Sequence, residues 1–222
     1  MMNEKAIKKF QDKGITILDP RNTYIGTEVK IAKGNIIYPN TFLKGKVSIG
    51  KGNSLGPNLY IEGNVKIGTG NTITYSHITN SKIGNSNQIG PYARLRDNTR
   101  ILNFVKIGNF VEMKNSSVGD RTQIAHLSYI GDSNIGKSVN IGAGTITANY
   151  NSLTGKKSKT IIKDKASTGS NSVLVAPVTI GEWAMVAAGS VVTKNVPNNA
   201  LAITRPKQEN KLNWTKKVKS FK

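Results

Sequence analysis

Aliphatic residues recur at every sixth position along most of this chain of 222 residues. A period of six fits neither an amphipathic helix nor the two-residue alternation of a long strand. It is typical of short flat strands that are separated by tight corners and stacked into a solenoid. Single steps of five residues shift the phase, and the series then resumes. The series is Ile25, Ile31, Ile37, Leu43, Ile49, Leu55, Ile61, Ile67, Ile73, Ile78, Ile83, Ile89, Leu95, Ile101, Ile107, Met113, Val118, Ile124, Ile130, Ile135, Ile141, Ile162, Thr168, Leu174, Ile180, Val186 and Val192.

Each six-residue unit predicts one side of a triangular coil whose aliphatic residue points inward. Glycine and asparagine adopt a positive φ at least cost, and we assign the corners of the coils to pairs such as Gly52-Asn53 and Gly70-Asn71. Stacked coils hydrogen-bond to each other at about 4.8 Å per layer. Roughly 25 hexapeptides, three per coil, predict about eight or nine coils. A β-sandwich also has many short strands, but the long-kept phase favours an all-β parallel β-helix.

Three segments are predicted. Residues 1–18 form an N-terminal helix and linker, residues 19–204 form the β-helix domain, and residues 205–222 form an extended basic arm. Asn3 is the candidate cap of the helix, which ends before Gly14. We expect this helix to cover the open bottom of the solenoid, where strand edges would otherwise be exposed.

The composition limits the chemistry and the partners. The chain has no cysteine, which excludes disulfides, thiolate metal sites and a thiol acyl-enzyme. Its net charge of +20 predicts attraction for anions such as coenzyme or sugar phosphates. Aromatic residues are not interleaved with the basic ones, which disfavours nucleic acid as a partner. No apolar run reaches the roughly 18 residues of a membrane span, and residues 1–14 hold no signal-peptide core, so we predict a cytoplasmic protein without membrane contact.

A flat solenoid wall needs an added feature to form a catalytic cleft. The segment from Asn149 to Thr160, NYNSLTGKKSKT, leaves the hexapeptide phase and is predicted to loop outward. A second source of a cleft is the face between copies of the chain, since prisms of this kind associate with threefold symmetry.

Several long motifs resemble a known family. From Ile107 onward the chain contains IGNFVEMKNSSVGD, AHLSYIGDSNIG, VNIGAGTITANYN, KKSKT, STGSNSVLVAPVTIG, VAAGSVVT and ALAITRPKQ, and near its start it contains GITILDPRNTYIG. Together these resemble the C-terminal acetyltransferase half of the bacterial bifunctional N-acetylglucosamine-1-phosphate uridyltransferase and glucosamine-1-phosphate N-acetyltransferase, a hexapeptide-repeat family. The resemblance covers essentially the whole chain, and it implies coils of left-handed sense, against the usual right-handed crossover.

The resemblance also implies a reaction. In that family the acetyltransferase half moves acetyl from acetyl-CoA to the amine of glucosamine-1-phosphate and needs no metal for this step. The product is a precursor of UDP-N-acetylglucosamine and of the cell wall. The family forms homotrimers with sites between subunits. The sequence contains no nucleotide-binding α/β region, so we expect no uridylyl transfer from it, and a separate chain is one candidate source of that activity.

Three residues match the family's catalytic positions. His126 matches the general base, and its reference pKa near 6.5 suits removal of a proton from an amine. Tyr129 matches a substrate contact, and Asn149 matches a hydrogen-bonding group beside the amine. The chain has only two histidines, which disfavours a zinc site of three histidines, and His77 is interpreted as structural.

Other residues match the binding positions of the family. Arg96, Lys114 and Lys157 match contacts to the sugar and its phosphate, where arginine offers paired donors and lysine a point charge. Asn140 matches a further sugar contact. The interrupting loop is about two residues longer than the common form, so Lys156 stays an alternative to Lys157.

The coenzyme positions lie in the C-terminal part. Ala143 and Ala188 match positions whose backbone binds the pantetheine arm of acetyl-CoA, Ser170 matches a contact near the thioester, and Arg205 matches a cation for the coenzyme phosphates. The basic arm with Trp214 has two interpretations, as a cover over a neighbouring site or as a solubilising tail.

Two other functions compete with this hypothesis. The same chemistry could act on another amino sugar, including one linked to a nucleotide. A non-catalytic basic scaffold is the third interpretation, which the retained catalytic residues disfavour.

Overall fold

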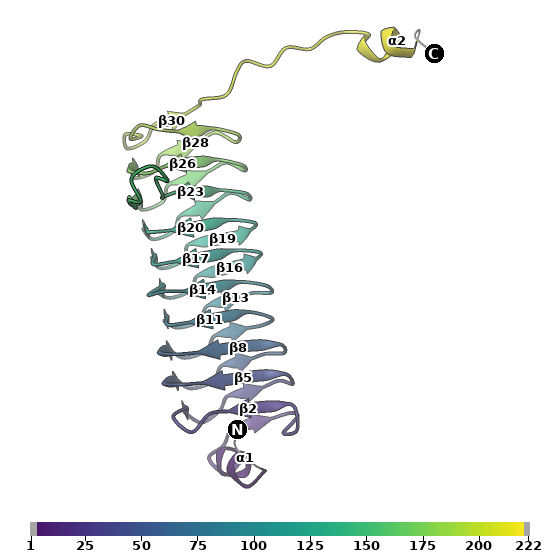
Figure 1. Ribbon diagram of the computed structural model, residues 1–222, viewed down its shortest axis with the longest axis vertical. Coiled ribbons are helices and arrows are strands. Elements are labelled where there is room, and N and C mark those ends of the chain that lie inside the picture. Colours follow the sequence, from purple (N-terminus) through teal and green to yellow (C-terminus); the bar gives the residue numbers. More distant parts are fainter. Residues whose placement is uncertain (1–3, 220–222) are drawn as a thin grey trace.

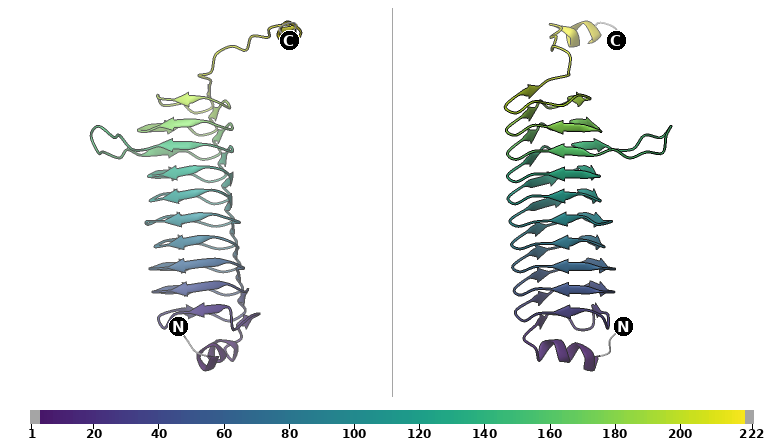
Figure 2. Two further views of the ribbon diagram at one scale, coloured as in Figure 1. Left: turned by 45° about the vertical axis from the view of Figure 1, so that its right-hand side comes forward. Right: turned by 90° about the vertical axis from the view of Figure 1, so that its left-hand side faces the viewer.

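The computed structural model describes residues 4–219 as a parallel β-solenoid with three walls. Successive strands turn from one wall to the next, and each strand pairs in parallel with the strands of the coils above and below it (Figures 1 and 2). The walls are sheets of 11, 10 and 9 strands, which we call the first, second and third sheet. The predicted left-handed parallel β-helix is confirmed.

The strands are short and evenly spaced. The first sheet contains β1 (Thr16–Ile17), β4 (Ile36–Ile37), β7 (Ser54–Leu55), β10 (Thr72–Ile73), β13 (Gln88–Ile89), β16 (Lys106–Asn109), β19 (Gln123–His126), β22 (Asn140–Ile141), β25 (Ser167–Thr168), β28 (Met185–Val186) and β30 (Leu201–Ala202). The second sheet contains β2 (Thr23–Ile25), β5 (Thr41–Lys44), β8 (Leu59–Glu62), β11 (His77–Thr79), β14 (Arg94–Arg96), β17 (Glu112–Lys114), β20 (Tyr129–Gly131), β23 (Ile146–Ala148), β26 (Val173–Val175) and β29 (Val191–Val192). The third sheet contains β3 (Lys30–Ile31), β6 (Val47–Ile49), β9 (Val65–Ile67), β12 (Lys82–Ile83), β15 (Arg100–Ile101), β18 (Ser117–Val118), β21 (Ser133–Ile135), β24 (Thr160–Ile162) and β27 (Val178–Ile180).

The solenoid is longer than the sequence count of about eight or nine coils. The 10 strands of the second sheet correspond to ten coils. The count began at Ile25 and ended at Val192, whereas β1 and β30 lie outside these limits. It also missed Thr147, which is fully buried at an inward position but is polar and so falls outside an aliphatic pattern.

The core is a single column of inward side chains. Every residue of the six-residue series is buried except Ile31, which is partly buried against the same cluster. Since a buried aliphatic side chain contributes about 1.5–3 kcal/mol through the hydrophobic effect, the column is the main stabilising feature of the fold.

We expect the replacement Leu95→Ala to lower the free energy of unfolding by about 2–5 kcal/mol, because it leaves a cavity at a side chain with 0% exposure. Urea denaturation followed by circular dichroism measures this change. The control Leu153→Ala makes the same chemical change at 95% exposure, and should stay within about 0.5 kcal/mol of the parent chain. Equal effects at the two positions would contradict the assignment of Leu95 to the core.

The asparagines assigned to the corners differ from the prediction in their backbone conformation and their burial. Gly52 and Gly70 have φ values of +66° and +67°, as expected. Asn53 and Asn71 were also assigned to positive φ, and this was wrong, because they are buried and form a hydrogen-bonded ladder. Asn53 Nδ2 donates to Asn35 Oδ1 at 2.9 Å, and Asn71 Nδ2 donates to Asn53 Oδ1 at 2.9 Å. The inward amides therefore satisfy one another from coil to coil.

The two ends of the solenoid differ. Helix α1 (Glu4–Gln11) covers the bottom, with Ile7 and Phe10 buried in the core cluster (Figure 1). The proposed cap Asn3 lies outside the described residues. At the top, the chain beyond β30 runs away from the last coil and ends in a short helix, α2 (Trp214–Lys219), which the sequence interpretation did not contain. Residues 220–222 of the predicted basic arm lie outside the described residues.

Among residues 4–219, no helix combines the length and the apolar character needed to cross a membrane.

Candidate active site

The candidate base lies at a corner of the solenoid. His126 is the last residue of β19, and its side chain is exposed. Its Nδ1 lies 2.7 Å from Oδ1 of Asn109, the residue paired with it one coil below. An amide oxygen only accepts hydrogen bonds, so in the neutral ring Nδ1 carries the proton and Nε2 keeps its lone pair. This tautomer leaves Nε2 available as a proton acceptor.

Three candidate coenzyme residues lie above His126, one in each of the next three coils. The amide of Gly144 donates to the carbonyl of His126 at 3.3 Å, so Ala143 stacks directly on His126. In the same way the next coils place Ser170 over Ala143 and Ala188 over Ser170, through hydrogen bonds of 2.7 Å and 2.8 Å to their carbonyls. We call the set Asn109, His126, Ala143, Ser170 and Ala188 the His126 column. Its members come from five successive coils and run parallel to the axis.

Asn140 and Arg205 flank this column. Asn140 begins β22 and pairs with Gln123 of the strand that carries His126. Arg205 Nη1 donates to the carbonyl of Ala188 at 3.3 Å, which holds a cation at the upper end of the His126 column.

A group of charged residues lies on the second sheet. Arg96 and Lys114 are register partners on β14 and β17. Arg96 Nε donates to Glu112 at 2.7 Å and Nη1 to Asp97 at 2.9 Å, and Lys114 Nζ lies 3.5 Å from the same oxygen of Asp97. The hydrogen bond that Arg96 donates to Glu112 raises the pKa of the Arg96 guanidinium. The structure therefore brings the two candidate phosphate contacts together, already engaged with two carboxylates.

Tyr129 and Asn149 meet above Gly131. A Cβ added to Gly131 would lie 2.7 Å from Tyr129 Oη and 2.7 Å from Asn149 Nδ2. Only glycine leaves room for these two side chains to lie where they do. We call Arg96, Lys114, Tyr129 and Asn149 the second-sheet group.

The His126 column and the second-sheet group are on opposite sides of one corner. His126 ends β19, Tyr129 begins β20, and Leu127 turns the chain between them with a φ of +51°. Within residues 4–219, no hydrogen bond joins a side chain of the His126 column to a side chain of the second-sheet group. A single chain therefore presents the candidate residues as two separate groups, which we call the two candidate half-sites.

Lys157 lies on the predicted outward loop. The loop between β23 and β24 projects away from the solenoid wall (Figure 2). Tyr150 and Lys157 form an isolated antiparallel bridge across it, and the amide of Ser158 donates to the carbonyl of Asn149 at 2.9 Å. The exposed side chain of Lys157 is thus carried outward by a loop with a closed base.

Two residues with clear contacts were missed by the sequence interpretation. Asn109 fixes the His126 ring, and Asp132, which is 7% exposed, accepts hydrogen bonds from Asn115 and Asn149. A signal for both exists in the sequence, since each lies 17 residues from a partner, which is one coil.

The other histidine has a different environment. His77 packs edge-on against Tyr60 with ring centroids 5.1 Å apart. Burial lowers the pKa of His77, and the nearby Arg94 lowers it further. Its aromatic packing fits the structural interpretation made from the sequence.

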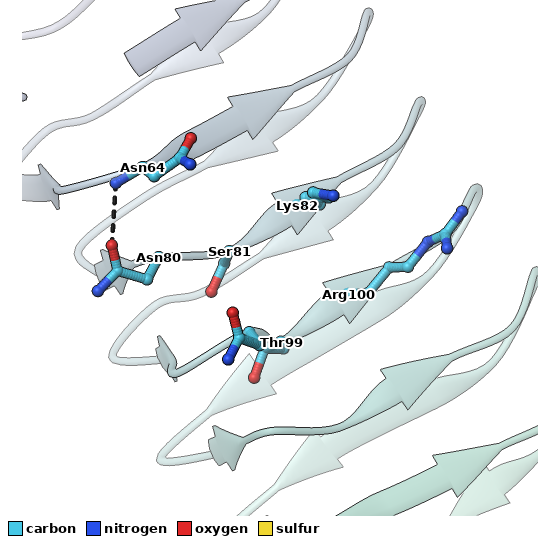
Figure 3. Close-up of a pocket in the computed structure, with 7 residues that line it drawn as sticks. Asn64, Asn80, Ser81, Lys82, Thr99 and Arg100 are labelled. Atoms are coloured by element: carbon cyan, nitrogen blue, oxygen red, sulfur yellow. Dashed lines mark hydrogen bonds between the residues drawn. The ribbon is translucent and has the colours of Figure 1, made fainter. Parts of the chain in front are cut away.

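Hollows on the single chain do not coincide with the candidate residues. One hollow of about 340 Å³ lies beside β12 and β15, where Lys82 and Arg100 are register partners (Figure 3). Its lining residues are Asn64, Asn80, Ser81, Lys82, Asn98, Thr99 and Arg100. This hollow and four others contain none of the eleven candidate residues.

Acidic and histidine side chains are spread out. Within the described part of the chain, no group of three or more of them is arranged to hold a metal ion.

Comparison with known proteins reveals close relatives. A family model described as bacterial transferase hexapeptide (six repeats) matches residues 159–194. The chain is 45% identical over 217 residues to the bifunctional protein GlmU of Brevibacillus brevis, covering 98% of this chain and 46% of that protein. It is 50% identical over 212 residues to GlmU of Carboxydothermus hydrogenoformans, covering 96% and 47%. The chain spans about half the length of the curated relatives it matches, and corresponds to their hexapeptide-repeat half.

Solved structures share the fold. UDP-N-acetylglucosamine acyltransferase of Francisella novicida superposes with a TM-score of 0.66 at 22% identity, covering 84% of this chain and 66% of that chain. The Arabidopsis UDP-N-acetylglucosamine acyltransferase gives a TM-score of 0.50 at 19% identity, covering 85% and 69%. At these identities the likeness concerns the fold alone.

Proposed function

Because this chain is related along almost its whole length to the hexapeptide-repeat half of bifunctional GlmU proteins, we propose that it transfers acetyl from acetyl-CoA to the amine of glucosamine-1-phosphate. The observation that carries the proposal is the His126 column. It aligns a base with a free Nε2 and three residues that match coenzyme positions along one corner of the solenoid.

The His126 column supports binding of the donor along the axis. Ala143 and Ala188 have small side chains that let a pantetheine arm approach the backbone closely, and Ser170 lies between them with a hydroxyl near the thioester. Arg205, held at the carbonyl of Ala188, supplies positive charge for the coenzyme phosphates.

The chemistry is a direct transfer. Nε2 of His126 takes a proton from the acceptor amine, and the amine nitrogen forms a bond to the thioester carbonyl carbon. Backbone or asparagine N–H groups stabilise the oxyanion. The C–S bond then breaks, and the departing coenzyme thiolate takes the proton from His126. No cysteine is present to form an acyl-enzyme.

The second-sheet group supports binding of the acceptor. Arg96 and Lys114 place two cations side by side for the sugar phosphate, and Tyr129 and Asn149 offer polar groups for the sugar and its amine. Asn140 and Lys157 are the further sugar contacts in this proposal.

We propose that the complete site forms between copies in a homotrimer. Two observations support this. The half-sites are on opposite sides of one corner, and an exposed ridge of Tyr92, Phe110 and Leu127 ends beside His126, with the two aromatic rings stacked at 5.4 Å. Bulky apolar side chains of this kind are typical of surfaces that a partner covers. The cytoplasmic location and a separate uridyltransferase chain also stay predictions.

A thiol-release assay tests the proposed reaction. Incubation of the purified chain with acetyl-CoA should release free coenzyme thiol only when an acceptor is added. We expect kcat/KM for glucosamine-1-phosphate to exceed that for a nucleotide-linked amino sugar by about tenfold or more, since polar groups built for one acceptor reject others. Addition of EDTA should leave the rate unchanged.

Two other outcomes of this assay would support the competing functions. Preference for a nucleotide-linked acceptor would identify the alternative acetyltransferase. Absence of thiol release with every acceptor, together with salt-sensitive binding of nucleic acid, would identify the basic scaffold.

A further inference from the structure

Asp132 is a nearly buried carboxylate that no step of the proposed reaction uses. It follows Gly131 at the corner after β20, with a φ of +48° and 7% exposure. One carboxylate oxygen accepts from Nδ2 of Asn115, one coil below, and the other accepts from Nδ2 of Asn149, one coil above. The side chain thus joins three coils.

A carboxylate in this position fixes which way the Asn149 amide faces. A carboxylate only accepts hydrogen bonds, so Asn149 must turn its NH2 group toward Asp132. Its carbonyl oxygen, Oδ1, then faces away from Asp132. Asn149 is itself only 7% exposed, which limits other orientations of the side chain. The free end of the amide is therefore an acceptor.

The backbone of Asp132 also anchors the loop that carries Lys157. Its amide donates to the carbonyl of Lys114 at 3.0 Å, and its carbonyl accepts from the amide of Thr160 at 3.3 Å. Asn149 begins the loop and Thr160 follows its end. Side chain and backbone of Asp132 thus hold both ends of the loop against the coil of Lys114.

We infer that Asp132 is a positioning residue of the acetyltransferase, an inference that rests on the proposed function. It keeps Oδ1 of Asn149 directed at the acceptor, where it accepts a hydrogen bond from the amine N–H. This bond orients the nitrogen lone pair toward the thioester while His126 removes the other proton. Asp132 touches neither substrate.

The variant Asp132→Asn separates orientation from packing, because asparagine has the same shape. Its single oxygen can serve only one of the two amides, so its NH2 group faces either Asn115 or Asn149. Asn149 no longer has a carboxylate that fixes its orientation, and when the new NH2 faces it, Asn149 keeps a hydrogen bond only by turning its own NH2 toward the acceptor. We expect kcat to fall about 100-fold, which is the size of effect that a misplaced substrate-positioning group has on a rate. The KM for acetyl-CoA should change less than about threefold.

The double variant Asn115→Asp with Asp132→Asn should restore activity. Residue 132 then donates its NH2 to the new carboxylate below and turns its oxygen to Asn149 above, so Asn149 returns to its original orientation. We expect kcat to recover to within about tenfold of the parent chain. Asp120→Asn is the matched control, because Asp120 also accepts from an asparagine one coil away, Asn103, but none of the candidate site residues bonds to it.

The outcomes distinguish the two levels of the proposal. A parent chain without acetyl transfer would overturn the proposed function. An active parent with an equally active Asp132→Asn variant would overturn this inference alone. It would also fail if Asp132→Asn lost activity only in step with its thermal unfolding midpoint and the double variant gave no recovery, because a purely structural role would then be sufficient.

Discussion

Replacing His126 with alanine should lower kcat for acetyl transfer about 1000-fold, within the range for loss of a general base. The amine is mostly protonated at neutral pH and needs a base to become a nucleophile. His126 is the histidine in line with the candidate coenzyme positions, and its Nε2 is left free by the bond from Nδ1 to Asn109. Single-turnover measurement of thiol release from acetyl-CoA isolates this chemical step.

His77→Ala is the matched control for this experiment. It removes the other histidine of the chain, which packs against Tyr60 on β8 and lies outside both half-sites. Its kcat should remain within about threefold of the parent chain, since a residue away from the reacting atoms changes transition-state binding little. If both variants retained full activity, His126 would not be the base.

The variant Gly131→Ala should lower kcat about 100-fold by displacing two candidate residues at once. Its Cβ would lie 2.7 Å from both Tyr129 Oη and Asn149 Nδ2, and 2.9 Å from Tyr129 Cε1, which is closer than real Cβ contacts allow. The obstructing atoms belong to side chains rather than backbone. The coil can therefore survive, with a loss of about 1–3 kcal/mol in the free energy of unfolding that is typical of overpacking.

Gly26→Ala provides the comparison. Gly26 directly follows the second-sheet strand β2, whereas Gly131 is the last residue of β20, and the Cβ added to Gly26 comes no closer than 3.3 Å to any neighbour. Its activity should match that of the parent chain in the same assay. Full activity of Gly131→Ala would show that the positions of Tyr129 and Asn149 are not needed for transfer.

Much of the fold could be predicted because the repeat is local. The inward residue of a six-residue unit depends only on the corners beside it, so residues such as Leu95 and Ile107 were assigned to the core and are fully buried. Inward positions that carry polar side chains were harder to predict from the sequence. Thr147 and the asparagine ladder that includes Asn53 break an aliphatic pattern while still pointing inward, because their polar groups bond within the core.

The candidate site could be predicted as a set of residues, and this came from resemblance to a family. The sequence did not predict which of those residues lie together in the folded chain. His126 and Ala188 are far apart in sequence but belong to one column, whereas His126 and Tyr129 are close in sequence and lie on either side of a corner. Asn109 and Asp132 were missed because their side-chain partners lie in neighbouring coils, 17 residues away in the sequence and outside any local motif.

The period of six by itself determined the coil, its inward residues and the outward loop at Asn149, since each depends on short-range chain geometry. Only the tertiary structure decided how the coils stack. Steps of five residues and the long insertion change how many residues separate neighbours in successive coils, so Asn109 lies 17 residues below His126, whereas Ser170 lies above Ala143 across the loop. Hydrogen bonds between coils fix this register. They determine that the candidate base, the row of candidate coenzyme positions and the buried carboxylate Asp132 come from successive coils near one corner.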